Sequence, residues 1–131
     1  MKNLIFDTGA LLAGDRDDPV MKAIVTAARD ANATIFVPAA CIAEAWRNGS
    51  RQANLARLLK TANDRPALDE NAAKRAGEML ARISGGVHVV DASVVDVALQ
   101  NEPAAIITSD PNDIHALLAA QPRHRVVVRP I

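Results

Sequence analysis

Residues 104–110 read AAIITSD, and this stretch decides how the chain is expected to fold. An apolar run of small and β-branched residues without polar interruption is typical of a buried strand. Asp110-Pro111 follows and indicates a helix start, because Asp caps helices and Pro suits their first turn. We therefore predict a central strand over 104–108 with a helix directly after it.

The same order, an apolar run and then a helical pattern, recurs on both sides of this stretch. Strands are predicted at 3–6, 34–37 and 126–129, with a short strand or extended run at 87–90. Further helices are expected over 51–62 and from 69 to about 84. Alternating strands and helices predict an α/β fold. We expect a single domain over 1–131, with a central, mostly parallel sheet of four to five short strands flanked by helices.

The composition excludes several classes of protein. Fifteen basic residues balance fifteen acidic ones, so the chain is not a bulk electrostatic nucleic-acid binder, and any polyanion site must be a local patch. With two Phe, one Trp and no Tyr, it offers no large stacking platform for single strands. The one cysteine, Cys41, has no partner for an internal disulfide. We expect no membrane span, no signal peptide and a cytoplasmic setting.

Four acidic residues lie just past apolar runs and carry the main indication of function. Asp7 follows NLIF, Asp91 follows VHVV, Asp110 comes two residues after AAIIT, and Glu44 lies on the helix after TIFV. In a parallel sheet, groups beyond the carboxyl ends of the strands meet at one edge. Carboxylates gathered there repel one another unless a cation neutralises them. Ligands that are all oxygen suit Mg²⁺ or Mn²⁺.

Each acid also has a purely structural explanation. Asp7 and Asp110 could be only helix caps, as we expect for Asp18 and Asp69. Glu44 is harder to explain in this way, because its neighbours are all apolar. It is expected either on an exposed face of its helix or buried with a cationic partner.

Two further acids near these positions have their own predictions. Asp96 is expected to be exposed. Asp113 lies one turn beyond Asp110, where it could support the site or be an ordinary first-turn acid.

Other chemistries find little support in the sequence. There is no G-x-x-x-x-G-K-[ST] or G-x-G-x-x-G motif for nucleotides. The three histidines have no zinc-type spacing, and we interpret His88, His115 and His124 as a strand, a helix-surface and a loop residue. Cys41 has no nearby His and is expected in the core.

Four stretches together resemble a known family. They are LIFDTGALLA (4–13), VPAACIAEAWRNG (37–49), VVDASVV (89–95) and IITSDPNDI (106–114). In this order and spacing they resemble PIN domains, and within them the VapC-like toxins of toxin–antitoxin pairs. The family pattern places its four acids on Asp7, Glu44, Asp91 and Asp110. Asp113 matches a further acid, and Thr108-Ser109 match the hydroxyl position before the fourth acid.

The resemblance implies a Mg²⁺- or Mn²⁺-dependent endoribonuclease that a small antitoxin neutralises and that typically forms a homodimer. Asp7 and Asp91 would contact the metal directly, Asp110 would be a direct or water-mediated ligand, and Glu44 would hold a metal-bound water or act as a base. Arg47, Arg51 and Arg57 are the candidate RNA contacts, with a solvated helix face as the alternative.

Three questions stay open at this level. A phosphoacceptor signalling domain is disfavoured, because Thr8 rather than a second acid follows Asp7 and no Lys occurs after Lys74. A non-catalytic PIN-like interaction module is a second alternative. Trp46, Leu55 and Leu59 are predicted either to line a groove or two-fold interface for a partner, or to belong to the core.

Overall fold

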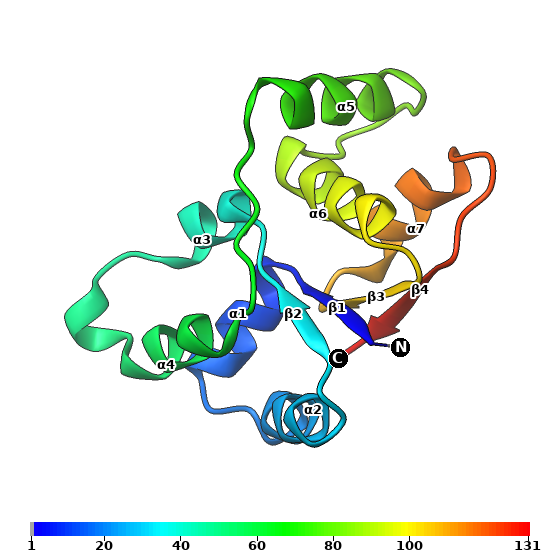
Figure 1. Ribbon diagram of the computed structural model, residues 1–131. Helices are drawn as coiled ribbons and strands as arrows, with labels where there is room; N and C mark the ends of the chain where they lie inside the picture. Colours follow the sequence, from blue (N-terminus) through cyan, green and yellow to red (C-terminus); the bar gives the residue numbers. More distant parts are fainter. Residues whose placement is uncertain (1) are drawn as a thin grey trace.

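Four parallel strands form the centre of the molecule (Figure 1). The computed structural model describes residues 2–131. The strands are β1 (Asn3–Phe6), β2 (Thr34–Phe36), β3 (Ala104–Thr108) and β4 (Val126–Pro130). Their order in the sheet is β2-β1-β3-β4, and every pair is parallel. The predicted α/β class and the parallel sheet are therefore confirmed.

Helices cover both faces of this sheet. In Figure 1, α5, α6 and α7 lie on one side, and α1, α2 and α4 lie on the other. The helices are α1 (Thr8–Asp15), α2 (Pro19–Asp30), α3 (Ala39–Ala45), α4 (Ala53–Thr61), α5 (Glu70–Ala81), α6 (Val89–Gln100) and α7 (Pro111–Ala119), with a short 3₁₀ turn, η1, at Gly49–Arg51. Within residues 2–131 we find no helix with the length and hydrophobicity that a membrane crossing requires.

Strand β3 lies inside the sheet, and all five of its residues are buried. It pairs with β1 on one side, with Ile5 beside Ile106, and with β4 on the other. Both neighbours run parallel to it, and helices cover both faces, so a continuous apolar run is the sequence that fits this place. The side chains of β1 and β3 form the centre of the hydrophobic core.

The strand order creates a crevice between the ends of β1 and β3. The chain moves from β1 to β2 on one side and then crosses to β3 on the other side of β1. The backbone N–H of Asp7 still donates to the carbonyl of Ile107, at 3.2 Å, so the two strand ends stay together up to this point. Ligands of open α/β sheets bind beyond the carboxyl ends of strands where the order reverses. The functional site is expected at this crevice.

Two predicted caps are confirmed. The Asp18 carboxylate accepts from the backbone N–H of Met21 at 3.1 Å and begins α2, with Pro19 in its first turn. The Asp69 carboxylate accepts from the N–H of Ala72 at 2.9 Å and begins α5. Each satisfies one of the free N–H groups at a helix start.

The prediction of a short strand or extended run at 87–90 is wrong for residues 89 and 90, while His88 is extended. Helix α6 begins at Val89, with His88 at its N-cap position. Residues 89 and 90 continue the apolar run into the residues after them, which are buried on α6, so the helix includes them. Asp91 therefore lies in the first turn of α6 and does not cap the helix.

Asp96 was expected on the surface, and this prediction is wrong too. Its relative exposure is 3%, and its carboxylate accepts from Nε of Arg75 at 2.8 Å and from Nη2 at 3.1 Å. The guanidinium supplies the charge and hydrogen bonds that a buried carboxylate needs. This ion pair links α5 to α6, two helices whose packing the sequence pattern alone did not reveal.

The apolar stripe of residues 51–62 is largely part of the core. The helix divides into η1 and α4, and Leu55 and Leu58 on α4 are buried while Leu59 is half-buried. Helix α4 packs against α1, where Gly14 leaves room for Leu58: a Cβ on Gly14 would lie 2.6 Å from its Cδ2. Leu55 therefore does not line a partner surface. Trp46, which is 39% exposed, and the half-buried Leu59 keep that role as candidates.

Candidate active site

Carboxylates from separate parts of the chain meet in a pocket of about 300 Å³ at the carboxyl edge of the sheet. The residues that line it are Asp7, Thr8, Gly9, Glu44, His88, Val90, Asp91, Val94, Ser109, Asp110 and Asp113. The pocket thus contains all four acids predicted from the sequence, together with Asp113 and Ser109. Thr108 lies fully buried just behind it, at the end of β3.

Asp7 is both a helix cap and a wall of the pocket. Its Oδ1 accepts from the backbone N–H of Ala10 at 2.8 Å, and only 5% of the residue is exposed. Burial raises the pKa of Asp7, the charge of Asp110 adds to the rise, and a hydrogen bond from the Thr108 hydroxyl opposes it. The cap explanation is therefore true of Asp7, but it does not explain why this carboxylate lies in one pocket with the other acids.

Burial and the charge of every other acid of the pocket raise the pKa of Asp91. Burial, followed by the charges of Asp113, Asp110, Asp7 and Glu44, raises the pKa of Asp91 to about 6. Raised pKa values of this kind arise where like charges share a confined space, and they are common at functional sites. A bound cation would relieve the repulsion.

Asp110 occupies the N-cap position of α7 without capping it through its side chain. Its backbone N–H donates to the Thr108 hydroxyl at 2.9 Å, which fixes the turn between β3 and α7. The carboxylate of Asp110 is exposed and free of helix contacts, and Asp113 follows in the first turn of α7. The structural explanation thus fails for the side chain of Asp110.

Glu44 lies on the exposed side of α3, which faces the pocket. Its Oε1 accepts from the hydroxyl of Thr8 at 2.7 Å, so the first residue of α1 holds it in place. This contact answers the question that the apolar neighbours of Glu44 raised. The residue is neither buried nor unpartnered.

A close approach between two loops shapes the floor of the site. A Cβ built on Gly9 would lie 1.8 Å from the Oγ of Ser109 and 2.8 Å from its Cβ. Only glycine at position 9 allows the start of α1 and the turn after β3 to come this near. The same approach brings Asp7 and Asp110 into one pocket.

Cys41 lies directly behind the acids and is fully buried, as expected of a core cysteine. Burial raises the pKa of its thiol to about 12; the charges of Asp7 and Glu44 contribute, and hydrogen bonds from Thr8 oppose the rise. A thiol that ionises only at such high pH is a poor nucleophile.

The donor chemistry of the pocket fits a hard divalent cation. Five carboxylates and the Ser109 hydroxyl offer oxygen ligands, the type that Mg²⁺ and Mn²⁺ prefer. As positioned, no group of three or more His, Cys, Asp or Glu side chains among residues 2–131 encloses a single metal position. An ion held by one or two of these carboxylates would complete its coordination with water.

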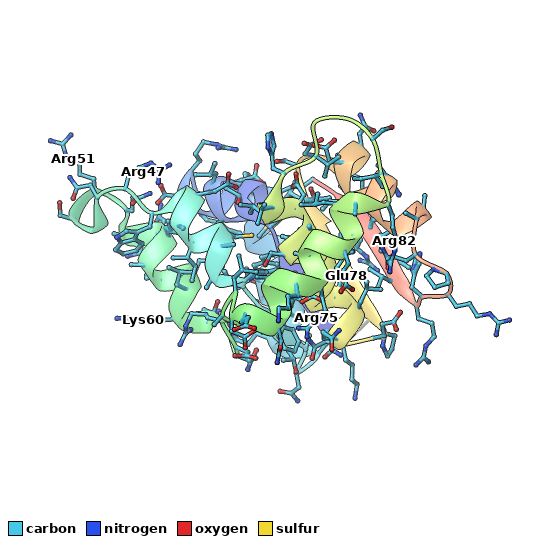
Figure 2. All side chains as sticks on the ribbon, turned by 90° about the horizontal axis from the view of Figure 1, so that it is seen from above. Arg47, Arg51, Lys60, Arg75, Glu78 and Arg82 are labelled. Carbon is cyan, nitrogen blue, oxygen red and sulfur yellow. The ribbon has the colours of Figure 1, made fainter. Side chains whose placement is uncertain are left out.

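The predicted RNA-binding arginines do not form one patch at the pocket. Arg47 and Arg51 lie near one another beyond the end of α3, at one end of the molecule (Figure 2). Arg47 Nη1 donates to the carbonyls of Ala43 and Trp46, both at 2.9 Å. Arg57 is on α4 and lines a different groove.

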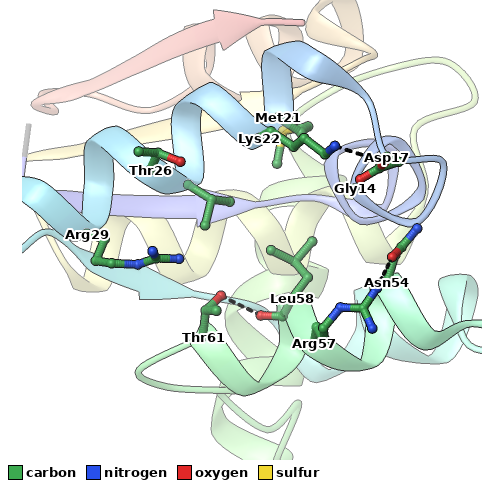
Figure 3. Close-up of a pocket in the computed structure, with 11 residues that line it drawn as sticks. Gly14, Asp17, Met21, Lys22, Thr26, Arg29, Asn54, Arg57, Leu58 and Thr61 are labelled. Atoms are coloured by element: carbon green, nitrogen blue, oxygen red, sulfur yellow. Dashed lines mark hydrogen bonds and ion pairs between the residues drawn. The ribbon is translucent and has the colours of Figure 1, made fainter.

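That second groove lies between α2 and α4 and has a volume of about 330 Å³ (Figure 3). Its lining includes the apolar residues Met21, Val25 and Leu58, with the exposed Arg29 on α2 and Arg57 on α4. Arg57 forms a hydrogen bond with Asn54 within α4. The groove combines an apolar lining with basic side chains.

The sequence interpretation missed the one titratable lining residue that is not an acid. His88 was assigned to a strand surface, but it is the N-cap residue of α6 and lines the acidic pocket. Its position three residues before Asp91 and two residues after Gly86 was the available signal. Recognising it requires knowing that the helix, rather than a strand, begins here.

Comparisons with known proteins extend this description of the fold. No protein-family model and no curated protein sequence matches the chain. Among solved structures, the chain is similar to VapBC2 from Rickettsia felis, crystallised bound to a DNA fragment from their promoter, with a TM-score of 0.69 and 14% identity over 98% of each chain. It is also similar to FitAcB from Neisseria gonorrhoeae, with a TM-score of 0.63 and 17% identity over 95% of each chain. The chain shares the fold of these structures across nearly its whole length.

Proposed function

We propose that this protein is a metal-dependent endoribonuclease of the PIN-domain type and the toxin of a toxin–antitoxin pair. The observation that carries the proposal is the pocket in which Asp7, Glu44, Asp91, Asp110 and Asp113 converge from distant parts of the chain. Capping explains Asp7 in part and none of the other four. A fold that gathers five like charges needs a reason to do so, and cation binding supplies one.

The proposed chemistry is hydrolysis of an RNA phosphodiester bond. When bound, Mg²⁺ or Mn²⁺ would supply an activated water and neutralise charge on the phosphate. Asp7 and Asp91 would hold the ion, with Asp110 as a further or water-mediated ligand. Asp113, Thr108 and Ser109 would orient these ligands.

Glu44 would orient the attacking water or accept its proton. The Thr8 hydroxyl occupies Oε1 of Glu44, which leaves Oε2 for this role. A general base must lie within hydrogen-bond reach of the proton that it accepts, and the position of Glu44 in the same pocket as the other acids supports this role.

The partner assignments belong to the same proposal. The fold similarity to VapBC2 and FitAcB, both toxin–antitoxin complexes, supports a toxin–antitoxin setting, a cognate antitoxin and a cytoplasmic location. The groove between α2 and α4, with Met21, Val25 and Leu58 in its lining, supports a partner that presents apolar side chains. RNA contact would come from Arg47 and Arg51, and the homodimer remains part of the proposal.

The experiment is a cleavage assay with purified protein, a labelled single-stranded RNA and Mg²⁺ or Mn²⁺. We expect cleavage that stops in EDTA and falls by about 10²–10⁴-fold in Asp7→Asn and Asp91→Asn, the range typical for loss of one catalytic group. Asp30→Asn, at the exposed end of α2, is the matched control and should cleave normally. Undiminished cleavage in EDTA would overturn the metal mechanism, and no cleavage with either ion would favour a non-catalytic interaction module.

A further inference from the structure

The pocket presents mainly hydrogen-bond acceptors to a substrate that is itself an acceptor. Five of its lining side chains are carboxylates, and an RNA phosphate has only acceptor oxygens. Neutralising the scissile phosphate with an ion leaves the neighbouring phosphates facing the acidic rim. A donor in the lining would hold these phosphates at the pocket itself, which Arg47 and Arg51 do not line.

Three lining side chains can donate a hydrogen bond, and they differ in availability. The Thr8 hydroxyl is already bound to Glu44 at 2.7 Å. Ser109 is neutral and lies against Gly9 on the floor of the pocket. His88 is exposed and is the one lining residue whose side chain can donate from a ring nitrogen or carry a positive charge.

The imidazole of His88 has no structural task in the described part of the chain. It occupies the N-cap position of α6 but makes no side-chain cap hydrogen bond. Its ring takes part in no hydrogen bond or ion pair found among residues 2–131. In contrast, the ring of His124 accepts from the backbone N–H of Val126 at 3.3 Å. A ring that is exposed, at the pocket and unbonded is available to a ligand.

We propose that His88 binds the RNA substrate by donating a ring N–H to a phosphate next to the scissile one. This inference rests on the proposed ribonuclease function and adds to it a contact on the side of the pocket formed by α6. The neutral imidazole carries one N–H, so the contact does not depend on the protonation state of the ring. His88 would be a substrate-positioning residue and would not ligate the ion.

The test compares His88→Ala, His88→Gln and His115→Ala with the wild type. His115 is an exposed histidine on α7 outside the pocket, so it is the matched control. A lost hydrogen bond to a charged group corresponds to about tenfold or more in binding. We therefore expect KM for RNA to rise about tenfold in His88→Ala with kcat nearly unchanged, and to recover in part in His88→Gln, whose amide also donates.

A second measurement separates this inference from the proposed function. Binding of labelled RNA is followed by fluorescence anisotropy with Ca²⁺, and Mn²⁺ binding is followed by calorimetry. Weaker RNA binding with unchanged Mn²⁺ affinity in His88→Ala supports the contact, even if the wild type binds RNA without cleaving it. Wild-type KM and RNA affinity in His88→Ala would overturn the role of His88 and leave the nuclease standing. A wild type that neither binds nor cleaves RNA would overturn both.

Discussion

Burial and four neighbouring carboxylates raise the pKa of Asp91 to about 6, so this single side chain makes the metal-free fold depend on pH. A carboxyl group whose pKa is higher in the folded chain binds its proton more tightly there. It therefore adds stability below the unfolded value near 3.8, and this stability is lost as the pH rises through about 6. Above that pH, the ionised Asp91 destabilises the fold unless a cation is bound.

Asp91→Asn should consequently raise the melting temperature in EDTA above pH 6, with a difference that shrinks as the pH falls toward the unfolded value. Differential scanning calorimetry across this window measures the effect, and Asp30→Asn serves as the exposed control. Added Mn²⁺ should raise the melting temperature of the wild type more than that of Asp91→Asn, because binding to the folded state alone stabilises it. A difference between variant and wild type that is the same at every pH would contradict the electrostatic explanation.

Position 9 has no room for a side chain beside Ser109. In Gly9→Ala the new Cβ would overlap Ser109, so the turn after β3 must shift and carry Asp110 with it. We expect a lower melting temperature and weaker Mn²⁺ binding. Adding Ser109→Gly removes both overlapping atoms and should restore part of the loss.

Gly77→Ala is the control for this glycine, because a Cβ there meets nothing within 4 Å. Position 77 lies inside α5, so alanine should stabilise the protein by about 0.5–1 kcal/mol through helix propensity. If both glycine variants behave alike in urea unfolding, close approach is not the reason for glycine at position 9.

At the scale of helices and strands, the ion pair between Arg75 and Asp96 fixes α5 on α6, the helix that carries Asp91. Asp96 is buried, so removing its partner leaves a charge without compensation. We expect Arg75→Met to lower the melting temperature clearly. Lys74→Met breaks the exposed pair with Glu70 at 2.7 Å and should change it little, since exposed pairs contribute weakly.

A double variant tests the cause. Arg75→Met combined with Asp96→Asn removes both charges and should be more stable than Arg75→Met alone, which a double-mutant cycle measures. If the two losses simply add, the packing of the arginine stem rather than its charge holds the two helices together.

At the scale of the whole molecule, one aromatic side chain is left partly exposed beside a basic region. The ring of Trp46 packs against Gly49, where a Cβ would lie 2.5 Å from Cζ2, and 39% of the residue is accessible. Arg47, its neighbour in the chain, lies with Arg51 and Lys60 at one end of the molecule in Figure 2. Exposed aromatic residues often dominate the binding energy of interfaces.

We expect Trp46→Ala to weaken self-association or antitoxin binding by about tenfold or more while lowering the melting temperature only slightly. Light scattering and calorimetric titration with the antitoxin measure these effects. Val20→Ala, at an apolar residue on α2 that is 52% exposed, is the control and should alter neither. An interface at this residue would be excluded by two results together: the wild type is a monomer, and Trp46→Ala binds the antitoxin as tightly as the wild type does.

The sequence by itself determined the parallel α/β fold, the caps at Asp18 and Asp69 and the candidate acids. These features depend on local chemistry: an apolar run needs burial, a cap satisfies the nearest N–H groups, and the carboxyl ends of parallel strands share one edge. The acids that follow β1 and β3, Asp7 and Asp110, could be placed in one pocket for that reason alone.

Only the tertiary structure decided the start of α6 at Val89, the burial of Asp96 and Leu55, and the place of His88. A short apolar run becomes strand or helix according to where its side chains can be buried, and Asp96 is buried because a guanidinium from another helix reaches it. Both conditions depend on residues distant in the chain. The helix start at Val89 is what brings Asp91 and His88 together at the pocket, so the arrangement of this site was decided by packing.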